Sequence, residues 1–291
     1  GRYSLLYNTT ASSNTAVGQA ALRDTTTGAN NTAVGQAALQ VNTSGHSNVA
    51  MGLNALNDNT TASYNTSVGT YSMDKTTTGS NNTAVGYQAL ELNTTGAGNI
   101  AVGKGALVAC TSGPSNVAIG NEALQALTTG DNNVCVGTSS GNQAAMINIT
   151  SENNRAVFGH QYIQYAYVKV AWTVTSDQRD KADITDFTHG LDYINELRPV
   201  NYVWDERSNY ADGISDGSKK KDLPQLGFLA QEIEAVETSL GITNNCVVDK
   251  ENPEHLKLTE TKLIPVLVNA IKELSTQNAA LAARLTTLEE G

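Results

Sequence analysis

Hydrophobic and polar positions repeat with a constant seventeen-residue period through the first half of the chain. Eight glycines fall at this spacing, each directly preceded by Val, Met or Ile and standing four residues after an Asn. All but the last are followed, four residues later, by Leu or Met. The glycines are Gly18, Gly35, Gly52, Gly69, Gly86, Gly103, Gly120 and Gly137. Self-similarity at a short fixed period is typical of repeat proteins, in which neighbouring units stack and bury one another's apolar face.

Each unit has the consensus N-x-x-V-G-x-x-A-L-x-x-x-T-x-G. It provides a short β-branched strand, a glycine that can adopt a positive φ, an apolar anchor and a polar turn. One unit is too short for two helices, and no 3.6-residue period is present. Residues 1–150 are therefore predicted to form a mainly β repeat rod, as a β-solenoid, β-roll or β-prism. We expect the Val and Leu positions to face inward, Asn and Thr to lie in turns or ladders, and several copies of the chain to share the thin core.

Several polar residues of the rod are interpreted as structural because they keep phase with the repeat. Asn8, Asn42, Asn59 and Asn93 match the N-x-S/T glycosylation pattern, but their phase predicts turn residues. Cys135 stands where other units have a small residue and is expected in the core.

The repeat loses phase after Gly137. Residues 156–159 resemble a degenerate last unit. The segment 151–175 is predicted to form an aromatic β collar that covers the open end of the rod, since an exposed sheet edge invites aggregation. The apolar positions of this collar are Tyr162, Tyr165, Tyr167, Val168, Val170 and Trp172.

Residues 176–258 mix helical and strand patterns and are predicted to form a compact α+β domain. Two short amphipathic helices are expected, over residues 191–197 and from Gln231 onward. Tyr202 and Trp204 alternate as on a strand and are expected in the core, and residues 208–224 are expected to form an exposed loop.

Residues 259–291 carry a heptad pattern and are predicted to form a long coiled-coil helix. Asn278 occupies one of its core positions, where a polar residue fixes register at a cost in stability. The positions of the seam are Ile264, Leu267, Ile271, Leu274, Asn278, Leu281, Leu285 and Leu288.

Charge and cysteine content narrow the function classes. The net charge is −10, with 6 Lys/Arg and 7 Asp/Glu in residues 1–175 and 12 and 21 in the remainder. Neither part has the basic surface expected of a nucleic-acid-binding protein. The 3 cysteines show no disulfide or metal-ligand spacing. No apolar run reaches membrane-spanning length. We therefore expect no metal, cofactor, nucleic acid or membrane insertion, and assembly in a reducing cytoplasm.

The junction between the rod and the second half contains a candidate nucleophile and base. Ser176 and Lys181 stand five residues apart in V-T-S-D-Q-R-D-K. A serine hydroxyl becomes nucleophilic when a base removes its proton, and lysine can serve only if its pKa falls from about 10.4 towards 7 through burial or a nearby cation. Alternatively, Ser176 and Asp177 cap a helix and Lys181 is a solvated charge.

Four motifs around this junction carry a resemblance to a known family. They are V-T-S-D-Q-R-D-K-A-D-I, G-L-D-Y-I-N-E-L-R-P-V-N-Y-V-W, L-G-F-L-A-Q-E-I-E and L-I-P-V-L-V-N-A-I-K-E-L. In this order they resemble the peptidase S74 family, the intramolecular chaperone domain of phage endosialidases, tail spikes and tail fibres. The rod's N-T/V-A-V/I-G motif is similar to the head repeats of trimeric autotransporter adhesins, which form β-rolls in a trimer.

The resemblance implies a homotrimer whose C-terminal domain helps the fibre to fold and is then cut off between Thr175 and Ser176. Ser176 would be the nucleophile and Lys181 the base of a single-turnover Ser-Lys self-cleaving peptidase that acts on no other substrate. Asp177, Arg179, Gln231 and Glu232 are candidates for a supporting role. Ile and Leu at the two seam positions would alone favour two strands, whereas the family implies three.

We therefore expect a tail fibre or tail spike segment of a virion, assembled in the host bacterial cytoplasm, with the chaperone domain released after cleavage. The rod is a candidate for binding a host surface glycan or protein receptor. Because the sequence begins at Gly1, further fibre or virion proteins are expected upstream. The alternative is an adhesin or structural stalk that does not cut itself and retains its trimerisation domain. A polysaccharide-degrading spike is a third hypothesis, but the rod's acidic residues are dispersed.

Overall fold

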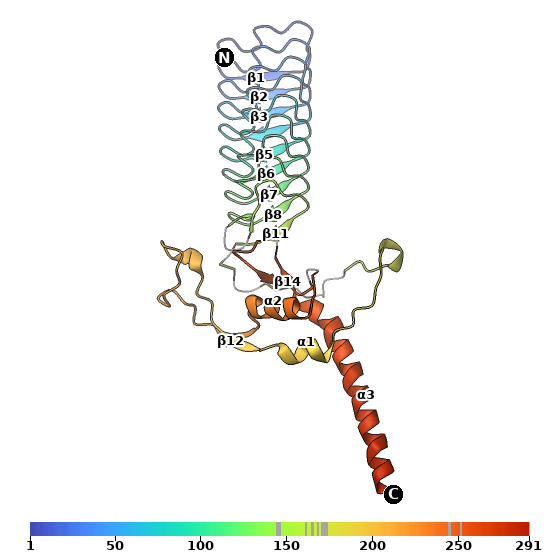
Figure 1. Ribbon diagram of the computed structural model, residues 1–291. Coiled ribbons are helices and arrows are strands. Elements are labelled where there is room, and N and C mark those ends of the chain that lie inside the picture. The colour runs from blue at the N-terminus through green and yellow to red at the C-terminus, as the bar shows by residue number, and fades with distance from the viewer. Residues whose placement is uncertain are drawn as a thin grey trace. The chain divides into compact units, whose positions relative to one another are not determined.

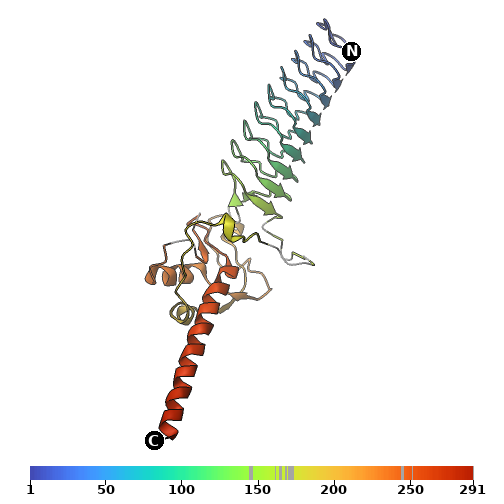
Figure 2. The same ribbon diagram turned by 90° about the vertical axis from the view of Figure 1, so that its right-hand side faces the viewer.

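The computed structural model describes residues 1–143, 147–160, 162–163, 166–167, 169, 174–243, 246–250 and 252–290 (Figures 1 and 2). The chain divides into two compact units, Gly1–Tyr167 and Val168–Gly291.

The first unit is a parallel β-solenoid, as the period of the sequence predicts. Nine strands form one sheet in the order β1-β2-β3-β4-β5-β6-β7-β8-β11, and from β1 to β8 each strand pairs in register with the equivalent strand of the next repeat. Figure 2 shows the strands stacked along one side of the coils. The strands are β1 (Thr15–Val17), β2 (Thr32–Val34), β3 (Val49–Met51), β4 (Thr66–Val68), β5 (Thr83–Val85), β6 (Ile100–Val102), β7 (Val117–Ile119), β8 (Val134–Val136) and β11 (Ala156–Phe158).

The loss of phase after Gly137 is explained by an insertion inside the last coil. Val134 of β8 pairs with Ala156 of β11, whereas Val117 of β7 pairs with Val134, so the last coil is five residues longer than the one before it. The additional residues accommodate an antiparallel pair, β9 (Asn142–Gln143) with β10 (Ile147–Asn148). Residues 156–159 are thus a last repeat unit, as predicted.

The predicted orientation of the Val column is wrong. Val17 is 56% exposed and Ile119 41% exposed, whereas the middle residue of almost every strand is buried. Side chains alternate between the faces of a strand, so in a three-residue strand only the middle one can face the interior. That position holds Ala33, Ala50, Ala84, Ala101 and Ala118, with Ser67 and Cys135 as small substitutes.

The Leu column is buried as predicted and closes the core within a single chain. Its members, from Leu22 to Leu124 with Met73 in one coil, have no exposed surface. They adopt a left-handed backbone, with φ between 49° and 54°. This conformation costs L-residues roughly 1–2 kcal/mol each, and burial of a Leu side chain contributes about as much or more. The core therefore does not need a second copy of the chain to be complete.

A ladder of buried asparagines connects successive coils. Asn82 Oδ1 accepts a hydrogen bond from the backbone N of Asn99 at 2.8 Å, and Asn82 Nδ2 donates to Gly96 O at 2.9 Å. The equivalent pairs recur from Asn14 to Asn133. The ladder satisfies backbone groups inside the rod that water cannot reach.

Replacing one rung should destabilise the rod strongly. Asn82→Ala removes both hydrogen bonds and leaves the buried amide of Asn99 without this acceptor, at roughly 1–3 kcal/mol, while the carbonyl of Gly96 keeps its hydrogen bond from Asn93 Nδ2. We expect a thermal unfolding midpoint several degrees lower by circular dichroism. Asn121→Ala, at an exposed turn position, is the control and should stay close to wild type. Equal melting of the two variants would contradict a stabilising role of the ladder.

A second buried column confirms that the glycosylation motifs are structural. Asn42, Asn59 and Asn93 have no exposed surface, and each donates through Nδ2 to the backbone carbonyl three residues later. Asn8 is exposed and bonds Ala11 in the same manner.

Two cysteines stand at positions where other coils have a buried Asn or a buried Ala. Cys110 takes the next place in the buried Asn column, and Cys135 fills a small core position as predicted. Burial raises the pKa of both thiols to about 11, which is consistent with packing rather than reactivity.

The second unit is a small α+β arrangement with a long terminal helix, again as predicted. Strand β12 pairs antiparallel with β13, and β14 with β15. The core consists of Tyr193, Ile233, Val247, Val248, Leu263 and Val266. The elements are η1 (Gln178–Asp180), α1 (Leu191–Glu196), β12 (Val200–Tyr202), η2 (Arg207–Asn209), β13 (Gln225–Gly227), α2 (Ala230–Ser239), β14 (Val248–Asp249), β15 (Lys257–Leu258), η3 (Glu260–Lys262) and α3 (Leu263–Glu289).

Two predictions about aromatic residues differ from the structure. Trp204 lies beyond the end of β12 and is 51% exposed, so it is no core residue, and Tyr202 is half-buried. In the predicted collar, Tyr162 and Tyr167 are exposed and belong to no strand. Its other members, Tyr165, Val168, Val170 and Trp172, lie outside the described residues.

Candidate functional site

The segment around Ser176 is extended and then makes one turn of 3-10 helix. Asp177 stands before η1, where its Oδ1 accepts from the backbone N of Arg179 at 2.9 Å. The turn ends at Lys181, whose backbone N donates to Gln178 O at 3.1 Å. This turn reverses the chain within five residues and brings the side chains at its two ends together.

The candidate nucleophile and base are in direct contact. Lys181 Nζ donates a hydrogen bond to Ser176 Oγ at 2.6 Å. Thr175, Ser176 and Lys181 are all exposed to solvent in the single chain. The contact has the geometry that proton transfer between the two groups would require, but the single chain does not shield it from water.

Arg179 is engaged away from this contact. Its guanidinium binds the carboxylate of Asp177, with Nη2 2.6 Å from Oδ2. The ion pair and the backbone hydrogen bond lower the pKa of Asp177, and the Asp177 carboxylate raises the pKa of Arg179. Asp177 thus serves as the cap of the turn and the partner of Arg179, so Arg179 does not act as a free cation beside Lys181.

Gln231 and Glu232 lie in the first turn of α2. Glu232 accepts from Arg198, with Oε2 3.1 Å from Nε, and Gln231 is exposed. Neither residue forms a hydrogen bond with Ser176 or Lys181 in the part of the chain that the structure describes. The Arg198–Glu232 ion pair connects the start of α2 with the segment after α1.

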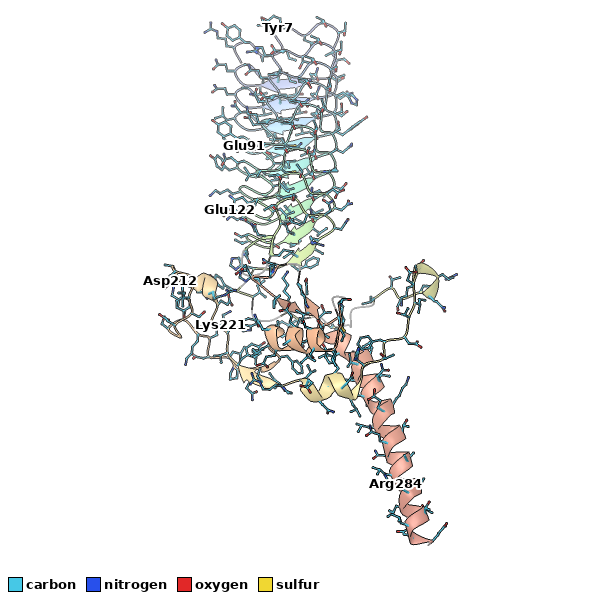
Figure 3. All side chains as sticks on the ribbon, viewed as in Figure 1. Tyr7, Glu91, Glu122, Asp212, Lys221 and Arg284 are labelled. Carbon is cyan, nitrogen blue, oxygen red and sulfur yellow. The ribbon has the colours of Figure 1, made fainter. Side chains whose placement is uncertain are left out.

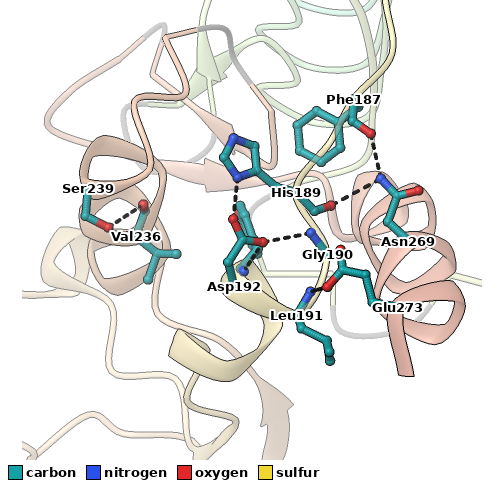
Figure 4. A network of polar contacts seen from close by, with 10 residues as sticks. Phe187, His189, Gly190, Leu191, Asp192, Val236, Ser239, Asn269 and Glu273 are labelled. Atoms are coloured by element: carbon teal, nitrogen blue, oxygen red, sulfur yellow. Dashed lines mark hydrogen bonds and ion pairs between the residues drawn. The ribbon is translucent and has the colours of Figure 1, made fainter. Parts of the chain in front are cut away.

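Helix α3 holds residues 187–191, just before and at the start of α1, in place (Figure 4). Asn269 Nδ2 donates to the carbonyls of Phe187, at 2.6 Å, and His189, at 3.2 Å. Glu273 Oε2 accepts from the backbone N of Leu191 at 3.0 Å. Gly190 packs closely against the same helix: a Cβ added to Gly190 would lie 2.3 Å from Glu273 Oε1. The start of α1 is therefore fixed by the same helix that carries the heptad pattern.

Asp192 completes this network. Its carboxylate lies 2.6 Å from His189 Nδ1 and accepts from the backbone N of Gly190 and Tyr193, each at 2.8 Å. The His189 contact, followed by these backbone hydrogen bonds, lowers the pKa of Asp192. The cluster orders the chain just before α1.

A buried carboxylate in the core was not foreseen from the sequence. Glu237 has no exposed surface, and its Oε1 accepts from Val247 N at 2.6 Å and from Tyr193 Oη at 3.2 Å. Burial, then the charge of Glu237, raises the pKa of the Tyr193 phenol. The sequence did carry one signal for this burial: Glu237 stands four residues after Ile233, so both residues lie on one face of α2. Its role is structural, since it connects α2 to β14.

The predicted seam lies on the solvent-exposed side of α3. Leu263, Val266 and Ala270 are buried against the rest of the unit, while all eight seam positions are exposed. The exposed seam residues are Ile264, Leu267, Ile271, Leu274, Asn278, Leu281, Leu285 and Leu288. A helix of 27 residues with an apolar stripe facing water requires a partner for that stripe.

Metal binding and membrane insertion are two further function classes on which the described residues bear. None of their His, Cys, Asp and Glu side chains gather in a group that could hold a metal ion. Among them, no helix has both the length and the apolar character needed to cross a membrane.

The fold and this site define the class of protein: a parallel β-solenoid is followed by a small α+β unit, which ends in a long helix with an exposed apolar stripe. In this chain, residues 176–242 match the model of the peptidase S74 family, described as the chaperone of endosialidase. The match begins at Ser176 and includes Lys181 and the whole of α2. No curated protein matches the chain. No solved structure matches it either.

Proposed function

We propose that this chain is a segment of a phage tail fibre or tail spike whose C-terminal domain drives assembly of three copies and then cuts itself off between Thr175 and Ser176. The observation that supports this most directly is the 2.6 Å contact of Lys181 Nζ with Ser176 Oγ at the first residue of the family match. The test is the intact mass of the expressed protein beside that of a Ser176→Ala variant.

The reaction is an acyl shift followed by hydrolysis. Lys181, as the neutral amine, takes the proton of Ser176 Oγ, which attacks the carbonyl carbon of Thr175. The C–N bond between Thr175 and Ser176 breaks, the departing amine takes the proton back from Lys181, and an ester joins Thr175 to Ser176 Oγ. Water then hydrolyses the ester, leaving a carboxylate on Thr175 and a free hydroxyl and amine on Ser176. Each chain performs this reaction once.

Assembly is proposed to switch this reaction on. In the single chain Lys181 Nζ donates to Ser176 Oγ, whereas a base must accept the proton of that hydroxyl. Burial disfavours the charged form of a lysine, and both residues are exposed here. A surface supplied by another copy would cover the pair, so cleavage would follow assembly rather than precede it.

The seam of α3 is proposed to hold the copies together. Ile271 is 64% and Leu281 58% exposed, and heptad spacing aligns such residues along one stripe. Three parallel helices that pack along this stripe would bury it. The a and d residue types alone favour two strands, so the number three rests on the family match.

A charge in the seam should abolish assembly and, with it, cleavage. For Leu281→Glu we expect at least about a tenfold loss of the assembled fraction by sedimentation, because three carboxylates would face one another in an apolar stripe. The control is Ala283→Glu, which lies on the opposite side of the helix and should assemble as wild type does. Assembly of the Leu281 variant at the wild-type concentration would refute the seam.

The second candidate is an adhesin or stalk that keeps its trimerisation domain. The exposure of the Ser176–Lys181 pair favours it, since the single chain provides none of the burial that favours the neutral form of a lysine. An intact chain recovered from fully assembled protein would make this function the better one. Binding of a host glycan or protein receptor, and attachment to upstream fibre or virion proteins, belong to both proposals.

A further inference from the structure

The outward face of the solenoid's sheet is uncharged and largely apolar. It consists of the first and third residues of strands β1 to β8 and β11. The third residue is Val in most strands, with Met51, Ile119 and Phe158 as large replacements. Val85 is 38% and Phe158 65% exposed. The core on the other side of the sheet is already closed by Ala and Leu, so the described residues of this unit do not need this face to complete their core.

No charged residue occupies any of these positions, although charged residues are present elsewhere in the same unit. They come from the turns: Glu91 and Glu122, for example, project away from the strands (Figure 3). Edge and surface strands of monomeric proteins normally carry charges that prevent association. The restriction of charge to the turns indicates that the sheet face is covered in the assembled protein.

The size of the face indicates what covers it. Nine strands give eight spacings of about 4.8 Å, and a three-residue strand is about 10 Å long, so the face measures about 400 Å². A stable interface between freely diffusing proteins buries about 800 Å² on each partner. A partner that is already tethered needs less, because tethering raises its effective concentration. A second copy joined through α3 is such a partner.

The spacing of the face also favours a copy of this chain. Its ridges recur once per strand, in register, along a straight line. An identical face has the same repeat and the same absence of charge, and parallel helices bring the copies together in the same direction.

We infer that the outward sheet face, the first and third residues of β1 to β8 and β11, is the surface through which the solenoids of neighbouring copies pack in the trimer. This rests on the proposed assembly of three copies. The turns that carry Glu91 and Glu122 then face outward, where a host surface is accessible.

Distances between copies test the inference in the full-length chain. Nitroxide labels are placed at Val85→Cys on the face and, as a control, at Thr95→Cys in the exposed bend between β5 and β6. Both are made in a Ser176→Ala, Cys246→Ser background, since Cys110 and Cys135 are fully buried. Because packed sheets lie about 10 Å apart, we expect the labels at position 85 within about 20 Å of one another and those at position 95 clearly further apart.

The outcomes separate this inference from the proposed function. A mass of three copies with position 95 closer than position 85 overturns the sheet-face inference alone. A single-copy mass with no distance between labels overturns the trimer as well. As a second variant, Val85→Lys should lower the unfolding midpoint by about 5 °C or more relative to Thr95→Lys, since only the first would bury a charge in each copy. Equal midpoints would count against the inference.

Discussion

Protein with Ser176→Ala should be recovered as one whole chain, whereas the wild type should yield two pieces that comprise residues 1–175 and 176–291 and begin at Gly1 and Ser176. The alanine removes the hydroxyl oxygen that we propose attacks the Thr175 carbonyl, so we expect the rate of cleavage to fall at least about 1,000-fold. Intact mass spectrometry over time after purification provides the measurement.

Variants of the proposed base and nucleophile distinguish an effect on the cleavage reaction from an effect on folding. Lys181→Arg keeps a positive charge and a donor near Ser176 but cannot become neutral, so it should also stay whole. Ser176→Cys keeps a nucleophile whose thiolate forms more readily, so it should still cut. Gln178→Ala, in the same exposed turn, is the matched control and should cut as wild type does. A wild type that stays whole after three copies have assembled would refute self-cleavage and favour the stalk.

Gly86→Ala should unfold part of the rod. Gly86 has φ +139°, a backbone that residues with a side chain rarely adopt, and an added Cβ would lie 2.5 Å from the carbonyl oxygen of Gly103 in the next coil. Six further glycines of the column approach the next coil equally closely. We expect a loss of about 3 kcal/mol or more, and an unfolding midpoint lower by about 6 °C or more in circular dichroism.

Gly98 provides a matched control in the same rod. It has φ +70°, and an added Cβ would have no neighbour within 3.4 Å. The equivalent residues Asn81 and Ser115 already adopt this backbone with a side chain, at φ 62° and 60°. Gly98→Asn should therefore change stability by no more than about 0.5 kcal/mol. If Gly86→Ala and Gly98→Asn melt alike, close packing of coils at the first glycine column is not limiting.

The proposed self-cleavage and the close packing of the coils are both related to the way in which a solenoid folds. Every strand of the sheet pairs with a neighbour that lies a full coil away along the chain, and long-range pairing of this kind folds slowly and exposes unpaired edges meanwhile. A domain that brings the chains together in register reduces this hazard. If that domain is removed by a single cut, the assembled rod can no longer come apart by the reverse of its assembly, so disassembly would be slow.

The sequence of the rod determined its architecture because the repeat is a local property. The constant period directly specified coils of equal length, the glycine column specified positive φ, and the Leu column specified the core. The helix with its heptad stripe and the buried position of Cys135 could be predicted for the same reason. In each case one residue type recurs at one structural position, so the pattern itself carries the geometry.

Tertiary structure decided which way each side chain faces. Val17 and its equivalents are apolar and β-branched, and nothing in their type distinguishes a core position from an exposed one. Only the three-residue length of the strands, with Ala33 and its equivalents at the centre, turned the Val column outward and left room for no larger side chain inside. Trp204 was misplaced for a similar reason: β12 ends at Tyr202, before the alternation that the sequence suggested could continue.

For the candidate site, too, the sequence determined some features and the tertiary structure decided others. The spacing of Ser176 and Lys181 indicated a possible pair, and the short turn between them brings Nζ to 2.6 Å from Oγ. The sequence could not show that Arg179 is held by Asp177, nor that Glu273 and Asn269 of α3 fix the segment before α1, because these contacts depend on side-chain directions or on elements far apart along the chain. Local spacing thus determined which residues could react, and only the packing of distant segments decided how they are held.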